Sequence, residues 1–315
     1  MRDIRIVFMG TPHFAVGVLQ KLVEEGKNIV GVITAPDKPA GRGRKLRPSA
    51  VKVYALSQAL PILQPTNLKD TAFLEALKGL NANLQIVVAF RMLPKVVWSL
   101  PEYGTFNLHA SLLPNYRGAA PINWAIINGE TKTGVTTFFI DDKIDTGEII
   151  LQDEVAISPN ETAGTLHDTL MHLGSELVLK TVSLLEKGPV VTQVQKQGTH
   201  LKEAPKLHTE NTRIDWKQAA AKIDTFIRGL SPYPGAWSLL RNGAEELVVK
   251  IHHATVVIAS HQDEIGSITA TKKEMKISVK NGYLYIEEMQ LAGKRKMAIR
   301  DLLNGYSFDD AAKML

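Results

Sequence analysis

The sequence predicts an α/β protein in which a doubly wound, Rossmann-like domain is followed by a small β-barrel. An apolar strand over 4–9, a helix over 13–25 and an apolar strand over 29–33 alternate in the order that builds a parallel sheet. Residues 84–90 supply a central apolar strand farther along the chain. After residue 247, short strands joined by polar turns follow one another, which is typical of a small antiparallel barrel. A chain of 315 residues is long enough for two such cores.

The remaining elements follow from local signals. Ser49 is the predicted N-cap of a helix over 49–60, because its hydroxyl can accept a hydrogen bond from a free N–H of the first turn. Leucines at helical spacing predict a long helix over 162–187, with an inner side made of Leu166, Leu170, Leu173, Leu177 and Leu184. The other predicted helices cover 70–80, 95–100, 121–128 and 217–230, and the other strands cover 61–63, 105–109, 134–140, 148–155, 247–253, 254–258, 266–270, 275–279 and 284–289.

Domain boundaries are predicted from changes in composition. Gly188-Pro189 ends the first domain, which spans 1–188. Residues 189–204 lack helical periodicity and are predicted to be an extended linker. The barrel domain spans 205–315, and a small barrel of this kind is compatible with oligonucleotide binding (OB-like).

Composition places the chain among ordinary globular proteins, because 44% of its residues are hydrophobic and 22% are charged. It has no cysteine, which excludes disulfides and thiolate chemistry and makes a reducing cytoplasm the expected compartment. The sequence contains no run of about 18 apolar residues, so no membrane-spanning helix is predicted. The net charge of +5 favours an anionic partner. No His, Asp or Glu cluster has metal-ligand spacing, so no metal is expected.

The turn after the first strand, Gly10-Thr11-Pro12, distinguishes this sequence from dinucleotide-binding dehydrogenases. Their turn contains three glycines, and its backbone N–H groups face a pyrophosphate. Here a proline replaces one of these N–H donors. A nicotinamide cofactor is therefore not expected.

Residues 35–49 contain three prolines, two glycines and five cations against one acid, which predicts a mobile surface loop. A solvated charge run is the ordinary interpretation of such a segment. The alternative is an arm that grips phosphates, in which the glycines let the backbone approach closely and Arg42, Arg44 and Lys45 supply charge.

The predicted strand that contains Asn107 carries the main candidates for chemistry. Alternate side chains of a strand share a face, so Asn107, His109 and Ser111 are predicted to lie together, with Phe106 and Leu108 buried behind them. An amide can donate a hydrogen bond to a carbonyl oxygen, and an imidazole can move a proton or stabilise an oxyanion. A polar strand end that only satisfies loop backbone groups has the same pattern, so this motif alone leaves both interpretations open.

A second segment favours the chemical interpretation. The strand over 134–140 leads into Asp141-Asp142-Lys143-Ile144-Asp145-Thr146-Gly147. The motif Asn-x-His-x-Ser-Leu-Leu-Pro, with Asp-Thr-Gly beginning 36 residues after its histidine, closely resembles the folate-dependent formyltransferases. This resemblance implies that Asn107, His109 and Asp145 are catalytic, that 1–188 is the formyltransferase domain and that 10-formyltetrahydrofolate is the formyl donor. The residues that it implies for donor contacts are Phe90, Arg91, Met92, Leu93, Ser111, Leu112, Leu113, Pro114, Ile140 and Asp142.

Two further segments resemble the members of this family that formylate initiator methionyl-tRNA. Pro-Ala-Gly-Arg-Gly-x-x-Leu at 39–46 resembles their characteristic insertion, and Pro-x-Pro-Gly-Ala-Trp at 232–237 resembles their C-terminal domain. The implied reaction transfers a formyl group to the α-amine of initiator methionyl-tRNA, giving N-formylmethionyl-tRNA for translation initiation. The implied tRNA contacts are Arg42, Arg44, Lys45, Lys206, Lys294, Arg295 and Lys296. For the last three, a solvated hairpin is an equal alternative.

The sequence departs from the family pattern in two places. Relatives usually have Ala-Tyr-Gly-x-x-Leu-Pro after the central strand, whereas residues 89–94 are Ala-Phe-Arg-Met-Leu-Pro, one residue shorter. Relatives also commonly have glycine where this chain has Lys143, so we expect a changed loop conformation and a retained activity.

Other functions account for less of the sequence. A formyltransferase acting on glycinamide ribonucleotide or an amino sugar would share the Asn/His/Asp site, but it would leave the arginine-glycine loop and the basic barrel without a role. A non-catalytic RNA-binding protein would have no use for the three site residues. We expect a cytoplasmic monomer that binds no membrane.

Overall fold

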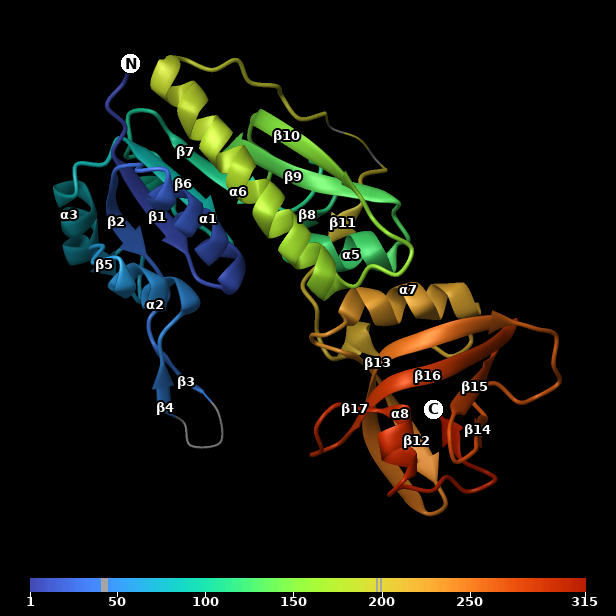
Figure 1. Cartoon of the computed structure of the whole chain (residues 1–315). Helices are drawn as coiled ribbons and strands as arrows, with labels where there is room; N and C mark the ends of the chain where they lie inside the picture. The colour runs from blue at the N-terminus through green and yellow to red at the C-terminus, as the bar shows by residue number, and fades with distance from the viewer. Residues whose placement is uncertain (41–44, 197, 199) are drawn as a thin grey trace. The chain divides into compact units, whose positions relative to one another are not determined.

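The computed structural model describes residues 1–40, 45–196, 198 and 200–315, and the chain divides into two compact units (Figure 1). Three segments form the first unit: 1–118, 132–155 and 167–203. The second unit consists of 119–131, 156–166 and 204–315. Two segments of the predicted first domain thus pack within the second unit, while the functional division at 188 and 204 stays a prediction.

The first unit contains a seven-stranded sheet in the order β10-β9-β7-β6-β1-β2-β5. Strands β5, β2, β1, β6 and β7 run parallel to one another, and β9 runs antiparallel to β7. The strand bounds are β1 Ile6–Gly10, β2 Ile29–Ile33, β5 Ile62–Leu63, β6 Leu84–Val88, β7 Thr105–His109, β9 Lys132–Phe139 and β10 Ile149–Ala156. The chain moves outward in one direction from β1 and in the other from β6, so the predicted doubly wound sheet is confirmed.

Helices pack on both faces of this sheet because its central strands are apolar on both sides. Val7 and Met9 of β1 belong to the cluster that includes Phe73 of α3 and Val97 of α4. On α6, Gly174 leaves room for Leu108 of β7, since a Cβ there would lie 2.7 Å from the leucine side chain. The helices of this part of the chain are α1 His13–Glu24, α2 Ala50–Ser57, α3 Thr71–Gly79, α4 Lys95–Trp98 and α6 Ala163–Lys187. The predicted Ser49 cap is confirmed, because its hydroxyl accepts a hydrogen bond from the Lys52 N–H at 3.0 Å.

The basic segment after β2 differs from the predicted loop. Its described part forms a two-stranded antiparallel sheet of β3 Lys38–Ala40 and β4 Lys45–Arg47. Local composition predicts irregular structure for both segments, because it does not reveal the backbone pairing between them. The predicted tRNA contacts Arg42 and Arg44 lie outside the described residues.

The prediction that Leu184 lies on the inner side of the long helix is wrong. Leu166, Leu170 and Leu177 are buried, but Leu184 is 38% exposed and Leu185 is buried instead. A step of seven residues falls about 20° short of two full helical turns, so a stripe extrapolated from 170 to 177 to 184 drifts off the inner face.

Part of the predicted linker is held in place by backbone hydrogen bonds and by burial. Gln193 exchanges two backbone hydrogen bonds with Ile149 of β10, at 2.8 and 2.9 Å. The side chain of Gln195 is buried. This part of the segment therefore packs within the first unit.

The second unit is built on an antiparallel sheet in the order β14-β15-β16-β13-β12-β18, with β17 paired to β16. Backbone hydrogen bonds from Ile268 N to Ala312 O and from Met314 N to Gly266 O join the two ends of this order, at 3.0 and 2.9 Å. The predicted barrel is thereby confirmed as a nearly closed one. Its strands are β12 Ala236–Asn242, β13 Glu245–Ile258, β14 Ile268–Ala270, β15 Met275–Val279, β16 Gly282–Leu291, β17 Met297–Ala298 and β18 Lys313–Met314.

The remaining elements are α5 Pro121–Ile127, α7 Ala220–Leu230, α8 Ile299–Leu303, a 3₁₀ turn Glu210–Thr212, β8 Arg117–Gly118 and β11 Glu203–Ala204. Helix α5 packs on α7, where the Asn123 amide donates to Gly229 O at 2.8 Å. No helix in the described part of the chain has the length and apolar content needed to span a membrane.

Strand β13 corrects a sequence prediction, since it is one strand where two were expected at 247–253 and 254–258. Its pairing with β16 shifts between Ile251 and His253, which makes a β-bulge at His252. His252 is 5% exposed, and neither ring nitrogen has a hydrogen-bond partner among the described residues. A β-bulge redirects a side chain while the strand continues, so the break in the alternation of buried residues does not mark the end of a strand.

We expect His252 to make the stability of the barrel depend on pH. Burial lowers the pKa of His252 from its ordinary value of 6.5. The unfolded chain therefore binds a proton more readily, so stability is complete above that ordinary value and is lost as the pH falls toward the folded pKa. Thermal unfolding midpoints between about pH 7.5 and about pH 5.5 should fall more in wild type than in His252→Met. Parallel pH profiles of the two proteins would contradict this expectation.

Candidate active site

Strand β7 positions Asn107 and His109 between two neighbouring strands. Asn107 lies opposite Val87 of β6 and Phe138 of β9. Phe106 and Leu108 are buried, as the alternation predicts, and Asn107 is half-buried. Among the described residues none hydrogen-bonds with the Asn107 side chain. A half-buried amide without a protein partner is available to a ligand, because buried polar groups are otherwise satisfied.

The hydrogen bonding of His109 assigns its neutral tautomer. Its Nε2 lies 2.8 Å from the carbonyl oxygen of Tyr116, and a carbonyl can only accept, so Nε2 carries a proton and donates it. The other nitrogen, Nδ1, lies 3.8 Å from Oδ2 of Asp145. In the neutral ring Nδ1 has a free lone pair, and in the charged ring it is a second donor. The nitrogen that faces Asp145 can therefore accept and return a proton.

Asp145 reaches this position from the loop between β9 and β10. Phe139 at the end of β9 pairs with Phe106, so the loop must run back along β7 to bring Asp145 beside His109. The Gly118 N–H donates to Oδ2 of Asp145 at 2.9 Å, and Asp145 itself has a left-handed backbone with φ 54°. Gly147 must be glycine, because a Cβ there would lie 1.7 Å from Phe139 O.

A buried glutamine, which the sequence did not identify, anchors this loop. The Gln195 amide donates to the backbone oxygens of Asp145 and Gly147 at 2.9 and 2.8 Å. Its own oxygen accepts from Arg117 Nη2 at 2.6 Å and Arg117 Nε at 3.2 Å. Gln195 and Arg117 thus hold the backbone that carries the Asp145 carboxylate. No motif marks Gln195, since it lies in a segment with the composition of a linker.

The predicted donor contacts after β7 are mostly inside the protein. Ser111 is completely buried and its hydroxyl donates to Asn115 O at 2.7 Å, so this hydroxyl is already engaged within the protein. Leu113 is buried in a small cluster with Phe138. Leu112 and Pro114 are half-buried. Backbone groups of this segment remain candidates for ligand contacts.

In the loop after β9, Ile140 is half-buried and Asp142 is exposed. The Lys143 N–H donates to the Asp141 carboxylate at 2.9 Å and closes a local turn. The Thr146 hydroxyl donates to the same carboxylate at 2.8 Å. Lys143 is therefore accommodated by a turn built on Asp141.

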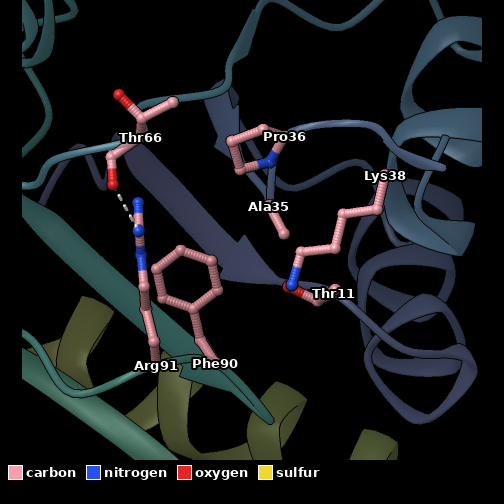
Figure 2. A pocket seen from close by; sticks show the side chains of 7 residues that line it. All are labelled: Thr11, Ala35, Pro36, Lys38, Thr66, Phe90 and Arg91. Atoms are coloured by element: carbon pink, nitrogen blue, oxygen red, sulfur yellow. Dashed lines mark hydrogen bonds between the residues drawn. The ribbon is translucent and has the colours of Figure 1, made fainter. Parts of the chain in front are cut away.

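The predicted donor contacts after β6 are divided between the core and a cavity. Leu93 is buried in the core and Met92 is 67% exposed. Phe90 and Arg91 line a cavity of about 420 Å³ at the carboxyl ends of the parallel strands (Figure 2). The rest of its lining is Thr11, Ala35, Pro36, Lys38 and Thr66. Ligands of open α/β sheets bind at this edge, where the strand order reverses.

The predicted tRNA contacts in the described region lie at the surface. Lys206 is exposed, and so are Lys294 and Arg295 in the turn between β16 and β17. Lys296 in the same turn pairs with Glu288 at 2.6 Å. The side chain of Lys45 is outside the described part. In the part of the chain that the structure describes, no three His, Asp or Glu side chains are grouped as metal ligands.

This fold and site define a class of protein in which amide, imidazole and carboxylate side chains lie at the edge of a doubly wound sheet, in a chain that continues into an antiparallel barrel. The formyl transferase family model matches residues 4–182, and the model of the formyl transferase C-terminal domain matches 206–307. The chain belongs to the formyl transferase family. The methionyl-tRNA formyltransferase of Flavobacterium johnsoniae is 59% identical over 314 residues, covering 100% of both chains.

Solved structures with little sequence identity share the fold. HypX from Aquifex aeolicus in complex with tetrahydrofolic acid gives a TM-score of 0.67 at 18% identity. The match covers 98% of this chain and 49% of that one, so this chain spans about half of HypX. An N-formyltransferase from Helicobacter canadensis in complex with folinic acid and dTDP-3-aminofucose gives 0.64 at 20% identity, covering 93% of this chain and 100% of the other. These likenesses establish the architecture alone.

Proposed function

We propose that this protein transfers the formyl group of 10-formyltetrahydrofolate to the α-amine of initiator methionyl-tRNA, giving N-formylmethionyl-tRNA for translation initiation. The observation that carries this proposal is the 59% identity, over both full lengths, to the methionyl-tRNA formyltransferase of F. johnsoniae. The arrangement of Asn107, His109 and Asp145 supports it from the chemical side. Folate as the donor is the expectation for this family, and a structural neighbour is complexed with tetrahydrofolic acid.

In the proposed chemistry the neutral amine attacks the formyl carbon and the formyl oxygen gains negative charge. The free amide of Asn107 donates a hydrogen bond to that oxygen, where a preorganised donor has its largest effect. Nδ1 of His109 accepts the proton that the attacking amine loses, and Asp145 faces the positive charge that forms on the ring. The ring then returns the proton to the folate nitrogen as the carbon–nitrogen bond to the donor breaks.

An α-amine has a pKa of about 8, so a useful fraction of it is neutral near pH 7 and no strong base is required. Positioning of the two substrates can contribute up to about 7–11 kcal/mol. The exposed cations Lys206, Lys294 and Arg295 support a role of the barrel domain in holding the tRNA. We further propose that the protein acts in the cytoplasm as a monomer, with 1–188 as the catalytic part and 205–315 as the tRNA-binding part.

Single-turnover formylation tests this function. Purified protein and 10-formyltetrahydrofolate are mixed with initiator methionyl-tRNA, elongator methionyl-tRNA or free methionine. We expect rapid formylation of initiator methionyl-tRNA only. Formyl transfer to a glycinamide ribonucleotide or an amino sugar, with none to these three acceptors, would keep the chemical site and overturn the acceptor.

A further inference from the structure

The side chain of Gln195 uses all of its hydrogen-bonding capacity inside the first unit. Its two N–H groups donate to Asp145 O and Gly147 O at 2.9 and 2.8 Å. Its oxygen accepts from Nη2 and Nε of Arg117 at 2.6 and 3.2 Å. An amide has two donors and an oxygen with two lone pairs, so no polar group of Gln195 is left for another partner. The amide therefore forms a fixed bridge between the loop of Asp145 and the Arg117 side chain.

The loop depends on such a bridge because the residues before Asp145 contribute little packing. Residues 142–144 are exposed, and the side chain of Ile144 is 62% exposed. Asp145 itself has a left-handed backbone at φ 54°, which a residue other than glycine keeps only where its surroundings enforce it. The two backbone oxygens that Gln195 holds belong to this strained residue and to the glycine two positions later. The position of the carboxylate is thus set largely from the Gln195 side of the loop.

Arg117 extends this support to the second reacting side chain. Directly before it in the chain, Tyr116 O accepts from Nε2 of His109 at 2.8 Å. Directly after it, the Gly118 N–H donates to Oδ2 of Asp145 at 2.9 Å. The bridging amide binds both the Arg117 side chain and the loop backbone, so it fixes the carboxylate relative to the ring, whose Nδ1 lies 3.8 Å from Oδ2.

We propose that Gln195 is a positioning residue for formyl transfer and that it acts on the reaction through Asp145. The inference rests on the proposed function, because it assigns Gln195 a part in that reaction. Gln195 is 5% exposed and bonds to backbone oxygens of the loop, so it controls where the carboxylate lies and does not bind the substrates itself. A misplacement of about 1 Å can lower a rate by about 10²-fold. Loss of the two donors should therefore lower kcat and leave the KM values unchanged.

Gln195→Glu tests this role, because a carboxylate keeps an oxygen that accepts from Arg117 and loses both donors to the loop. We expect kcat to fall by about 10–100-fold, with both KM values within about twofold of wild type. Asn83→Asp is the matched control. Asn83 is a buried amide directly before β6 that accepts from the Arg5 N–H and donates to Asp3 O, both at 2.7 Å. This control should lower the thermal unfolding midpoint and keep wild-type kcat.

A double-mutant cycle separates positioning from a general loss of structure. If Gln195 acts through Asp145, Gln195→Glu should lower kcat by less than about threefold once Asp145→Asn is already present. A general loss of structure would lower kcat equally in both backgrounds. That equal loss, or a folded Gln195→Glu protein with near-normal kcat, would overturn the proposal.

Amide hydrogen exchange at Gly118, followed by NMR, provides a readout that does not depend on the acceptor. The Gly118 N–H donates to the Asp145 carboxylate, so displacement of this carboxylate exposes the N–H to water. We expect exchange at Gly118 to accelerate by about tenfold in Gln195→Glu and to stay unchanged in Asn83→Asp. Unchanged exchange in Gln195→Glu would contradict the positioning role.

Wild-type formylation of initiator methionyl-tRNA is measured in the same series. Its absence would overturn the proposed function, and the exchange at Gly118 would still decide whether Gln195 positions Asp145.

Discussion

Asn107→Ala should lower kcat by about 10²–10³-fold, because it removes an amide donor that makes no hydrogen bond with another described residue and can meet the developing oxyanion. The side chain is half-buried and makes no hydrogen bond with another described residue, so its loss leaves no protein group unsatisfied. The unfolding transition should therefore change little. Rapid-quench formylation with both substrates saturating measures kcat, and thermal unfolding checks the fold.

Asn160→Ala provides the control, since Asn160 is exposed in a turn and lies outside β7. It should keep wild-type turnover. A folded Asn107→Ala enzyme with near-normal kcat would contradict the role of the amide. If instead the KM values rose and kcat stayed constant, Asn107 would be a binding group with equal contacts in the ground and transition states.

Asp145→Asn should lower kcat by about 10²–10⁴-fold, the range typical of groups that assist proton transfer. The change removes the negative charge that faces Nδ1 of His109 and leaves an oxygen able to accept from the Gly118 N–H. Asparagine also tolerates the left-handed backbone at φ 54° better than alanine does, so the loop should keep its conformation. Single-turnover rates with initiator methionyl-tRNA measure the effect.

The control is Asp153→Asn, which loses one exposed ion pair with Lys180 and lies within β10, outside the loop that carries Asp145. We expect this variant to retain full activity. Asp145→Asn with near-normal turnover and an unchanged unfolding midpoint would remove Asp145 from the proposed chemistry. The same two measurements on Asp145→Ala separate the loss of charge from any loss of loop structure.

Comparison of the predicted and observed elements indicates where local sequence is sufficient to predict their bounds and their buried faces. The N-cap at Ser49 is defined by one hydroxyl and a hydrogen bond to the N–H of Lys52, three residues on, so the sequence alone locates the start of α2. The exposure of Leu184 could not be predicted from local sequence, because it depends on which side of α6 the sheet covers near the end of this helix. The single long strand β13 was missed for a related reason: the bulge at His252 breaks the alternation of buried residues while the chain remains in the sheet.

Local sequence was enough to predict the doubly wound class, the barrel, the family resemblance and the candidates Asn107, His109 and Asp145, because each depends on short-range periodicity or on a compact motif. The nitrogen of His109 that faces Asp145 can be identified only in the folded protein, since it depends on the carbonyl of Tyr116. Tertiary folding alone brings Gln195 to the Asp145 loop across 50 residues of chain and joins Lys38, Phe90 and Thr66 in one cavity. Such long-range contacts are selected by the packing of whole elements, and no local pattern of residues specifies them.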